Sequence, residues 1–279
     1  MNESLTMENG RAVLRMERRL RHAPEKVWRA VTEPAQLGRW FPFQVTELDL
    51  QVGGKVTFDD GHGTVLDGVV AELDPPKVFA FVQYAPAAMP RESDTLLRFE
   101  LRPEGGGCLL TFTHVFHDRP AAASYASGWE VCLNAMESVL AGEPVQWPEG
   151  GFPHLHQAYV EAFALAEGSA ERDGEGWRVR FERQLTEPVE KVWARLGGAT
   201  ATAGAPAPDG FGGTGAVTAL RPPAVLEYAR AGGRVRWELS RGTGHGARLV
   251  LTETGLTDPA PALAAWRDRI EALAREMLP

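Results

Sequence analysis

The chain has 279 residues, of which 44% are hydrophobic and 24% are charged, a composition typical of folded globular proteins. A chain of this length is suited to two domains of about 140 residues each. The formal net charge is −8 and the arginines are scattered among acidic residues, so a nucleic-acid partner is not expected. No apolar run approaches the roughly 20 residues of a membrane span, so no membrane partner is expected either.

The first half of the chain begins with the signals of a strand and two short helices. Residues 13–20 alternate between apolar and polar side chains, which predicts a strand. Pro24 predicts the first turn of a short helix, and residues 37–41 predict a second short turn that carries Trp40 and Phe41.

Consecutive short strands and one long helix follow. Helical spacing of apolar residues over 124–141, ended by Gly142, predicts an amphipathic helix whose apolar side only the sheet can cover. After Pro153 we expect a helix, and residues 168–176 are predicted to be a polar linker. Turns rich in Gly, Asp and Pro separate predicted strands at 55–58, 65–74, 78–84, 95–102 and 108–116.

The second half of the chain repeats the first. Trp129 and the apolar helical positions after it recur as Trp266 and its successors. The offset is 165 residues in the first matching block and 147 in the second, so the second copy lacks a net 18 residues between them. The matching blocks are 17–28 with 182–193, 68–78 with 215–225, and 97–101 with 235–239.

The order of strand, two short helices, antiparallel meander and long terminal helix resembles the helix-grip fold of the Bet v 1-like, START-like SRPBCC superfamily. Within it, the first copy is similar to bacterial domains related to the activator of the heat-shock protein 90 ATPase. The resemblance implies an α+β chain of two helix-grip domains, each a curved antiparallel sheet wrapped around a long C-terminal helix. The segments that carry it are 23–28, 37–41, 52–56, 68–78, 110–114 and Gly128-Trp129.

We therefore expect three parts along the chain. Residues 11–142 form an intact helix-grip domain, 143–176 a helical connector and linker, and 177–279 a degenerate second copy. In that copy an Ala-, Gly- and Pro-rich stretch at 197–208 replaces the second helix and its aromatic pair. The second copy is therefore interpreted as a packing partner of the first domain or a scaffold.

A sheet that grips a helix often leaves an interior pocket, and the first copy has apolar and aromatic residues suited to line it. The alternative is that these side chains pack against one another as an ordinary core. The predicted ligand-binding residues are Trp40, Phe41, Phe79, Phe81, Phe99, Leu110, Phe112, His114, Phe116, Trp129, Leu133 and Met136.

His114 is the polar residue of most interest in this set. We expect it on the inward face of its strand, where burial lowers the pKa of an imidazole. It would hydrogen-bond to a ligand carbonyl or transfer a proton, or else be a core histidine bonded to a backbone carbonyl. Glu130 and Asp67 are further candidate acids, with a solvated surface position as the alternative. His117 projects to the opposite face of the strand from His114, so no metal site is predicted.

Two other features of the sequence are interpreted as structural rather than functional. Cys108 and Cys132 fall in apolar segments and are interpreted as reduced core residues rather than a disulfide or a nucleophile. The glycine-rich stretch 209–215 resembles the glycine-rich loop of plant helix-grip proteins. A dinucleotide cradle needs a helix after the glycines, whereas residues 216–220 predict a strand, so the stretch is interpreted as a turn and no cofactor is expected.

The leading hypothesis is that the first domain binds a small lipophilic or aromatic molecule in an interior cavity, as a carrier or sensor without covalent chemistry. One alternative is a polyketide cyclase- or dehydratase-like enzyme, a type that the superfamily also contains, using His114 with Glu130. A less favoured alternative is activation of a chaperone ATPase, because the Asn- and Trp-rich motif of the full eukaryotic activators does not occur in the sequence. The first ten residues lack the pattern of a signal peptide, so a cytoplasmic location is expected.

Overall fold

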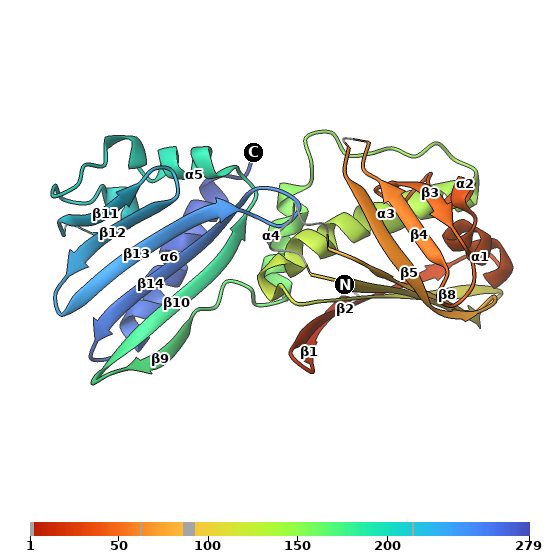
Figure 1. The fold of residues 1–279 in the computed structure, drawn as a ribbon, viewed down its shortest axis with the longest axis horizontal. Helices are drawn as coiled ribbons and strands as arrows, with labels where there is room; N and C mark the ends of the chain where they lie inside the picture. Colours follow the sequence, from red (N-terminus) through yellow and green to blue (C-terminus); the bar gives the residue numbers. More distant parts are fainter. Residues whose placement is uncertain (1–2, 62, 86–92, 214) are drawn as a thin grey trace. The chain divides into compact units, whose positions relative to one another are not determined.

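The computed structural model describes residues 3–61, 63–85, 93–213 and 215–279. The chain divides into two compact units, Met1–Phe152 and Pro153–Pro279, which we call the first and second domains. In each of them an antiparallel sheet accompanies one long helix (Figure 1), so the chain has the predicted α+β, two-domain helix-grip fold. No helix in the described ranges is long and apolar enough to cross a membrane.

The first domain contains an eight-stranded antiparallel sheet with the strand order β1-β2-β8-β7-β6-β5-β4-β3. The predicted strands are confirmed to within a few residues, and β1 and β3 are additional to them. β1 pairs with β2 across Asn9 and Gly10, which both have positive φ, and an Asn-Gly pair is a strong hairpin signal. The strands are β1 (Glu3–Glu8), β2 (Arg11–Leu20), β3 (Gln44–Leu48), β4 (Lys55–Asp59), β5 (Val65–Asp74), β6 (Val78–Gln83), β7 (Thr95–Glu104) and β8 (Gly107–Phe116).

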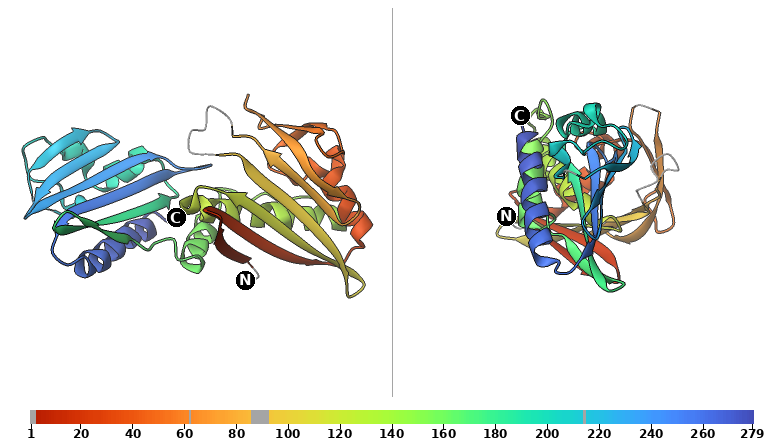
Figure 2. Two further views of the ribbon diagram at one scale, coloured as in Figure 1. Left: turned by 60° about the horizontal axis from the view of Figure 1, so that its bottom comes forward. Right: turned by 90° about the vertical axis from the view of Figure 1, so that its left-hand side faces the viewer.

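The sheet of the first domain curves around its long helix α3 (Figure 2). α3 buries Leu133 and Met136 completely, and it ends at Gly142, whose left-handed φ of 76° allows the chain to leave the helix. Pro24 begins the first short helix, as predicted. The helices are α1 (Pro24–Thr32), α2 (Pro34–Leu37), the short 3-10 helix η1 (Arg119–Ala121) and α3 (Ala122–Ala141).

The second domain contains a six-stranded antiparallel sheet with the strand order β11-β12-β13-β14-β10-β9, and α6 lies across one face of it (Figure 2). Its strands are β9 (Ser169–Asp173), β10 (Gly176–Leu185), β11 (Val217–Arg221), β12 (Val225–Arg230), β13 (Gly233–Arg241) and β14 (Ala247–Leu256). Its helices are α4 (Pro153–Ala162), α5 (Val189–Arg195), the 3-10 helices η2 (Gly198–Thr200) and η3 (Asp209–Phe211), and α6 (Ala260–Glu276).

The two sheets have the same strand order once two strands are removed from the first. β5-β6-β7-β8-β2-β1 corresponds to β11-β12-β13-β14-β10-β9, and β3 and β4 have no counterpart. Both strands lie between the blocks where the sequence offset falls, so their loss accounts for the net 18 missing residues. The registers also agree: His114 pairs with Leu14 and Leu97, and Glu253 pairs with Val179 and Val235. His114 and Glu253 therefore occupy equivalent places in the two domains.

The segment predicted as connector and linker has more structure than expected. Residues 169–173 form β9, which pairs with β10 as the counterpart of the β1–β2 hairpin, so the expectation of a linker at 168–176 is wrong. α4 belongs to the second domain, where Gln157 hydrogen-bonds to Arg183 at 2.6 Å and to Glu271 at 3.0 Å. Polar and glycine residues suit a hairpin as well as a linker, and local composition does not distinguish the two.

Candidate functional site

The interior of the first domain is an aromatic cluster on the concave side of its sheet. Alternation along β8 places Leu110, Phe112, His114 and Phe116 on one face, against α3. All twelve side chains predicted to bind a ligand are buried, with exposed fractions between 0 and 8%. The structure therefore brings the whole predicted set together.

These rings contact one another closely. The ring centroids of Phe112 and Trp129 are 4.5 Å apart, those of Phe99 and Phe112 are 5.0 Å apart, and those of Phe41 and Trp129 are 5.5 Å apart. Two pockets of this domain, one at Arg19 to His22 and one at Lys26 to Arg39, are lined by none of the twelve side chains. These side chains thus form a cluster of aromatic rings in contact with one another.

His114 is the one ionisable side chain among the twelve, and its hydrogen bonding fixes its tautomer. Its Nδ1 accepts a hydrogen bond from the indole Nε1 of Trp129 at 3.2 Å. Burial, with a smaller contribution from the charge of Arg11, lowers the pKa of His114 from 6.5 to about 3. The imidazole is therefore neutral at ordinary pH and carries its proton on Nε2, as a hydrogen-bond donor.

The surface beside His114 is formed by the first half of α3. The ring of Tyr125, which is half-buried, meets the edge of His114 at 4.6 Å and lies 4.7 Å from Phe116. One turn further on, a Cβ atom at Gly128 would find nothing within 4 Å, so the helix faces open space there. Tyr125 is thus the side chain that separates His114 from the outside of the helix.

The other predicted acids and thiols lie outside this arrangement. Glu130 is half-buried on α3 and forms no hydrogen bond with His114 in the described ranges. Asp67 is exposed on β5, where it accepts a hydrogen bond from Thr57 at 3.0 Å, as expected for a surface position. Cys108 and Cys132 are buried free thiols, which confirms that they are reduced core residues. No group of three or more metal-ligating side chains occurs among the described residues.

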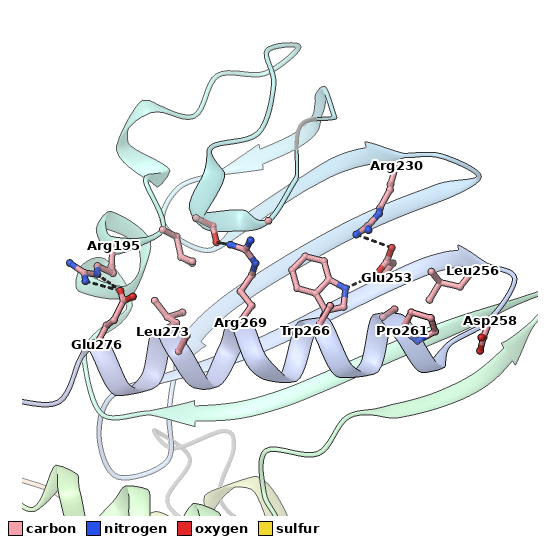
Figure 3. Close-up of a pocket in the computed structure, with 16 residues that line it drawn as sticks. Arg195, Arg230, Glu253, Leu256, Asp258, Pro261, Trp266, Arg269, Leu273 and Glu276 are labelled. Atoms are coloured by element: carbon pink, nitrogen blue, oxygen red, sulfur yellow. Dashed lines mark hydrogen bonds and ion pairs between the residues drawn. The ribbon is translucent and has the colours of Figure 1, made fainter.

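The second domain contains a hollow that the sequence interpretation missed (Figure 3). It is a groove of about 720 Å³ between α6, the end of β14 and the loop that contains η3. In its wall the indole Nε1 of Trp266 donates to Glu253 at 2.5 Å, which repeats the Trp129–His114 contact with a carboxylate as the acceptor. Two features of the sequence could have predicted this groove. One is the match of Glu253 with His114 in the repeat, and the other is the row of alanines along one side of α6.

The loop containing η3 turns its carbonyl groups toward neighbouring donors. Phe211 O accepts from Tyr228 Oη at 3.0 Å and from Trp237 Nε1 at 3.1 Å. The oxygens of Asp209 and Gly210 accept from Arg269, and the amide groups of Phe211 and the following residue close the 3-10 turn. A phosphate cradle needs amide N–H groups pointing outward, so the interpretation of this stretch as a turn is confirmed for the described residues.

Comparison with known proteins identifies one family and several solved structures. A family model described as Activator of Hsp90 ATPase homolog 1-like protein matches residues 21–141. CalU16 from Micromonospora echinospora is 22% identical, with 58% of this chain and 94% of that chain covered and a TM-score of 0.46. MLL2253 from Mesorhizobium loti is 25% identical over 47% of this chain and 97% of that chain, with a TM-score of 0.43. The search of curated proteins found no match.

Proposed function

We propose that the first domain, whose residues 21–141 match the family model described as Activator of Hsp90 ATPase homolog 1-like protein, binds a small lipophilic or aromatic molecule carrying a carbonyl group, without covalent chemistry. The observation that carries the proposal is the neutral His114, whose Nε2 has no hydrogen-bond partner among the described residues. Its surroundings are aromatic. The protein would act as a carrier or sensor of that molecule.

The energetic argument rests on this donor. A ligand carbonyl that accepts a hydrogen bond from this Nε2–H group would contribute about 0.5–1.5 kcal/mol. The rings of Phe112, Phe116 and Trp129 supply the apolar contacts for the rest of the molecule. A ligand with an acceptor is therefore favoured over a pure hydrocarbon of the same shape.

The entry route that we propose leads past Tyr125. Its ring contacts His114 edge-on, so rotation about its side-chain bonds exposes the imidazole beside the open space at Gly128. Rotation of a half-buried side chain does not require the sheet to move. Binding would then follow a side-chain rearrangement within the aromatic cluster.

The test is a thermal-shift screen that compares an aromatic ketone with its hydrocarbon analogue, such as 1-tetralone with tetralin. We expect the ketone to raise the melting temperature of the wild-type protein and of His117→Leu by several degrees. His117 is exposed three residues along the chain and serves as the matched control. His114→Leu should remove the preference for the ketone. If no aromatic ketone raises the melting temperature, or if His114→Leu responds like the control, the proposal is wrong.

The cyclase-like alternative requires His114 to accept a proton near neutral pH. A base with a pKa of about 3 is too weak for this under ordinary conditions, so the lowered pKa favours hydrogen bonding over proton transfer. Turnover of polyketide mimics that His114→Ala abolishes would establish the enzyme instead.

A further inference from the structure

The groove of the second domain combines an apolar strip with one guanidinium group, that of Arg269, which forms no ion pair among the described residues. We propose that it binds a small amphipathic carboxylate, with the carboxylate on Arg269 and the apolar body along α6. This site is separate from the interior of the first domain and does not depend on His114.

The groove exists because residues that cover the equivalent place in the first domain are missing or reduced. In the first domain Phe41 lies 5.5 Å from the ring of Trp129, and in the second domain the short helix and two strands of that region are lost. With the helical offset of 137 residues, Tyr125 corresponds to Ala262. The smaller side chain leaves the side of Trp266 open to a ligand (Figure 3).

The apolar strip follows one side of α6. Ala262, Ala265 and Ala272 recur at helical spacing, and the latter two are exposed. Leu256 at the end of β14 and the side of Trp266 add larger apolar surfaces. A volume of about 720 Å³ is in the usual range for sites that hold small organic molecules.

Most of the charges in the groove are already paired. Arg230 contacts Glu253 at 3.1 Å, and Arg195 contacts Glu276 at 2.7 Å. Asp258 accepts from the amide of Ala260 at the start of α6, and Ala260 is 9 residues and therefore about 14 Å of helix from Arg269. That separation exceeds the screening length of about 8 Å at physiological salt, so the carboxylate of Asp258 hardly offsets the charge of Arg269.

Arg269 is held in place by two backbone oxygens. Its Nη1 donates to the backbone oxygens of Asp209 at 3.1 Å and Gly210 at 3.4 Å. A Cβ atom at Gly212 would lie 2.9 Å from its Nε, so the glycine lets the loop approach the side chain closely. A guanidinium has five N–H groups, and those on Nε and Nη2 have no partner among the described residues. This is a pre-oriented cation with donors left for a carboxylate.

The experiment is a calorimetric titration of the full chain with 2-naphthoate and with its neutral analogue 2-naphthamide. We expect naphthoate to bind at least tenfold more tightly than the amide. Arg269→Gln should remove that difference, whereas Arg267→Gln should change the affinity less than twofold. Arg267 lies on the same helix, outside the groove, and pairs with Glu167 at 3.5 Å, so it controls for the loss of one positive charge.

A second pair of variants tests the place of binding. Ala265→Phe fills the groove and should abolish binding, whereas Ala264→Phe, at the neighbouring exposed position outside the groove, should not. His114→Leu should leave the affinity for naphthoate unchanged, which separates this site from the first domain. Equal affinities for naphthoate and naphthamide, no binding at millimolar concentration, or equal behaviour of the two phenylalanine variants would overturn the proposal. Tighter binding of phenyl phosphate than of naphthoate would overturn the assignment to a carboxylate. The affinity for decanoate, compared with that for naphthoate in the same titration, distinguishes an aliphatic from an aromatic apolar body.

Discussion

The buried ion pair between Arg183 and Glu271 offers a sharp test of what stabilises the second domain. Arg183 Nε and Glu271 Oε1 are 2.8 Å apart, with exposed side-chain fractions of 3% and 9%. Gln157 bridges the pair, since it donates to Glu271 and accepts from Arg183. Arg183→Met or Glu271→Met alone leaves one buried charge without its partner, which costs about 3–5 kcal/mol. The double variant replaces both charges with apolar groups and should cost far less than the sum of the single variants.

The same pair predicts a dependence on pH. Burial raises the pKa of Glu271, but the charge and hydrogen bond of Arg183, together with the hydrogen bond of Gln157, outweigh it and the net pKa is lowered. The unfolded chain therefore binds a proton on this group at a higher pH than the folded chain does. The stabilisation is complete above the unfolded pKa of about 4.3 and is lost as the pH falls below it.

The assay is urea unfolding monitored through hydrogen exchange of the amides of β10 and α6. These amides report on the second domain separately. Arg195→Met is the matched control, because Arg195 pairs with Glu276 at 2.7 Å while both side chains are 54% exposed, and such pairs contribute at most about 1 kcal/mol. The reasoning fails if Arg183→Met costs no more than Arg195→Met. It also fails if the double variant costs as much as the two single variants together.

Three further predictions concern single residues. Burial lowers the pKa of His114 from 6.5 to about 3, so the free energy of unfolding of the first domain should fall by about 2 kcal/mol as the pH is lowered from 6.5 to 5. His114→Leu should flatten this dependence, as measured by urea titrations at the two pH values. Burial raises the pKa of Cys132 to about 12, so thiol reagents at pH 8 should modify it only after unfolding; rapid labelling of the folded chain would contradict this. Gly212→Ala should destabilise the second domain more than Gly204→Ala does in thermal unfolding, and equal effects would be evidence against the close contact. The two glycines have φ of 79° and 80°, but a Cβ atom at Gly212 lies 2.7 Å from Trp266 and one at Gly204 meets nothing within 4 Å.

Local patterns in the sequence predicted most of the elements and the domain repeat. Apolar alternation identifies a strand such as β8, and Gly142 after a helical stripe marks the end of α3. These features depend on neighbouring residues, and the sequence contains them directly. The hairpin of β1 and β2 could also have been predicted, because Asn9-Gly10 is a local signal for a β-hairpin turn.

The strand residues among the twelve were predicted from the same alternation and those of α3 from helical spacing, but such periodicity says only which face of a strand or helix a side chain occupies. Whether those side chains leave a hollow depends on how rings from several strands and α3 fill the space between them. In the first domain the rings of Phe41 and Phe112 both contact that of Trp129.

The sequence by itself determined the fold class, the two copies and the inward place of His114, because each follows from local periodicity or from matching blocks. Only the tertiary structure decided that the groove lies in the second domain and that Arg269 is held there by backbone oxygens. The loss of two strands is visible as 18 missing residues, but the surface that it uncovers belongs to α6, far along the chain. A hollow arises between elements distant in sequence, so its position is a property of the packed domain and not of any one segment.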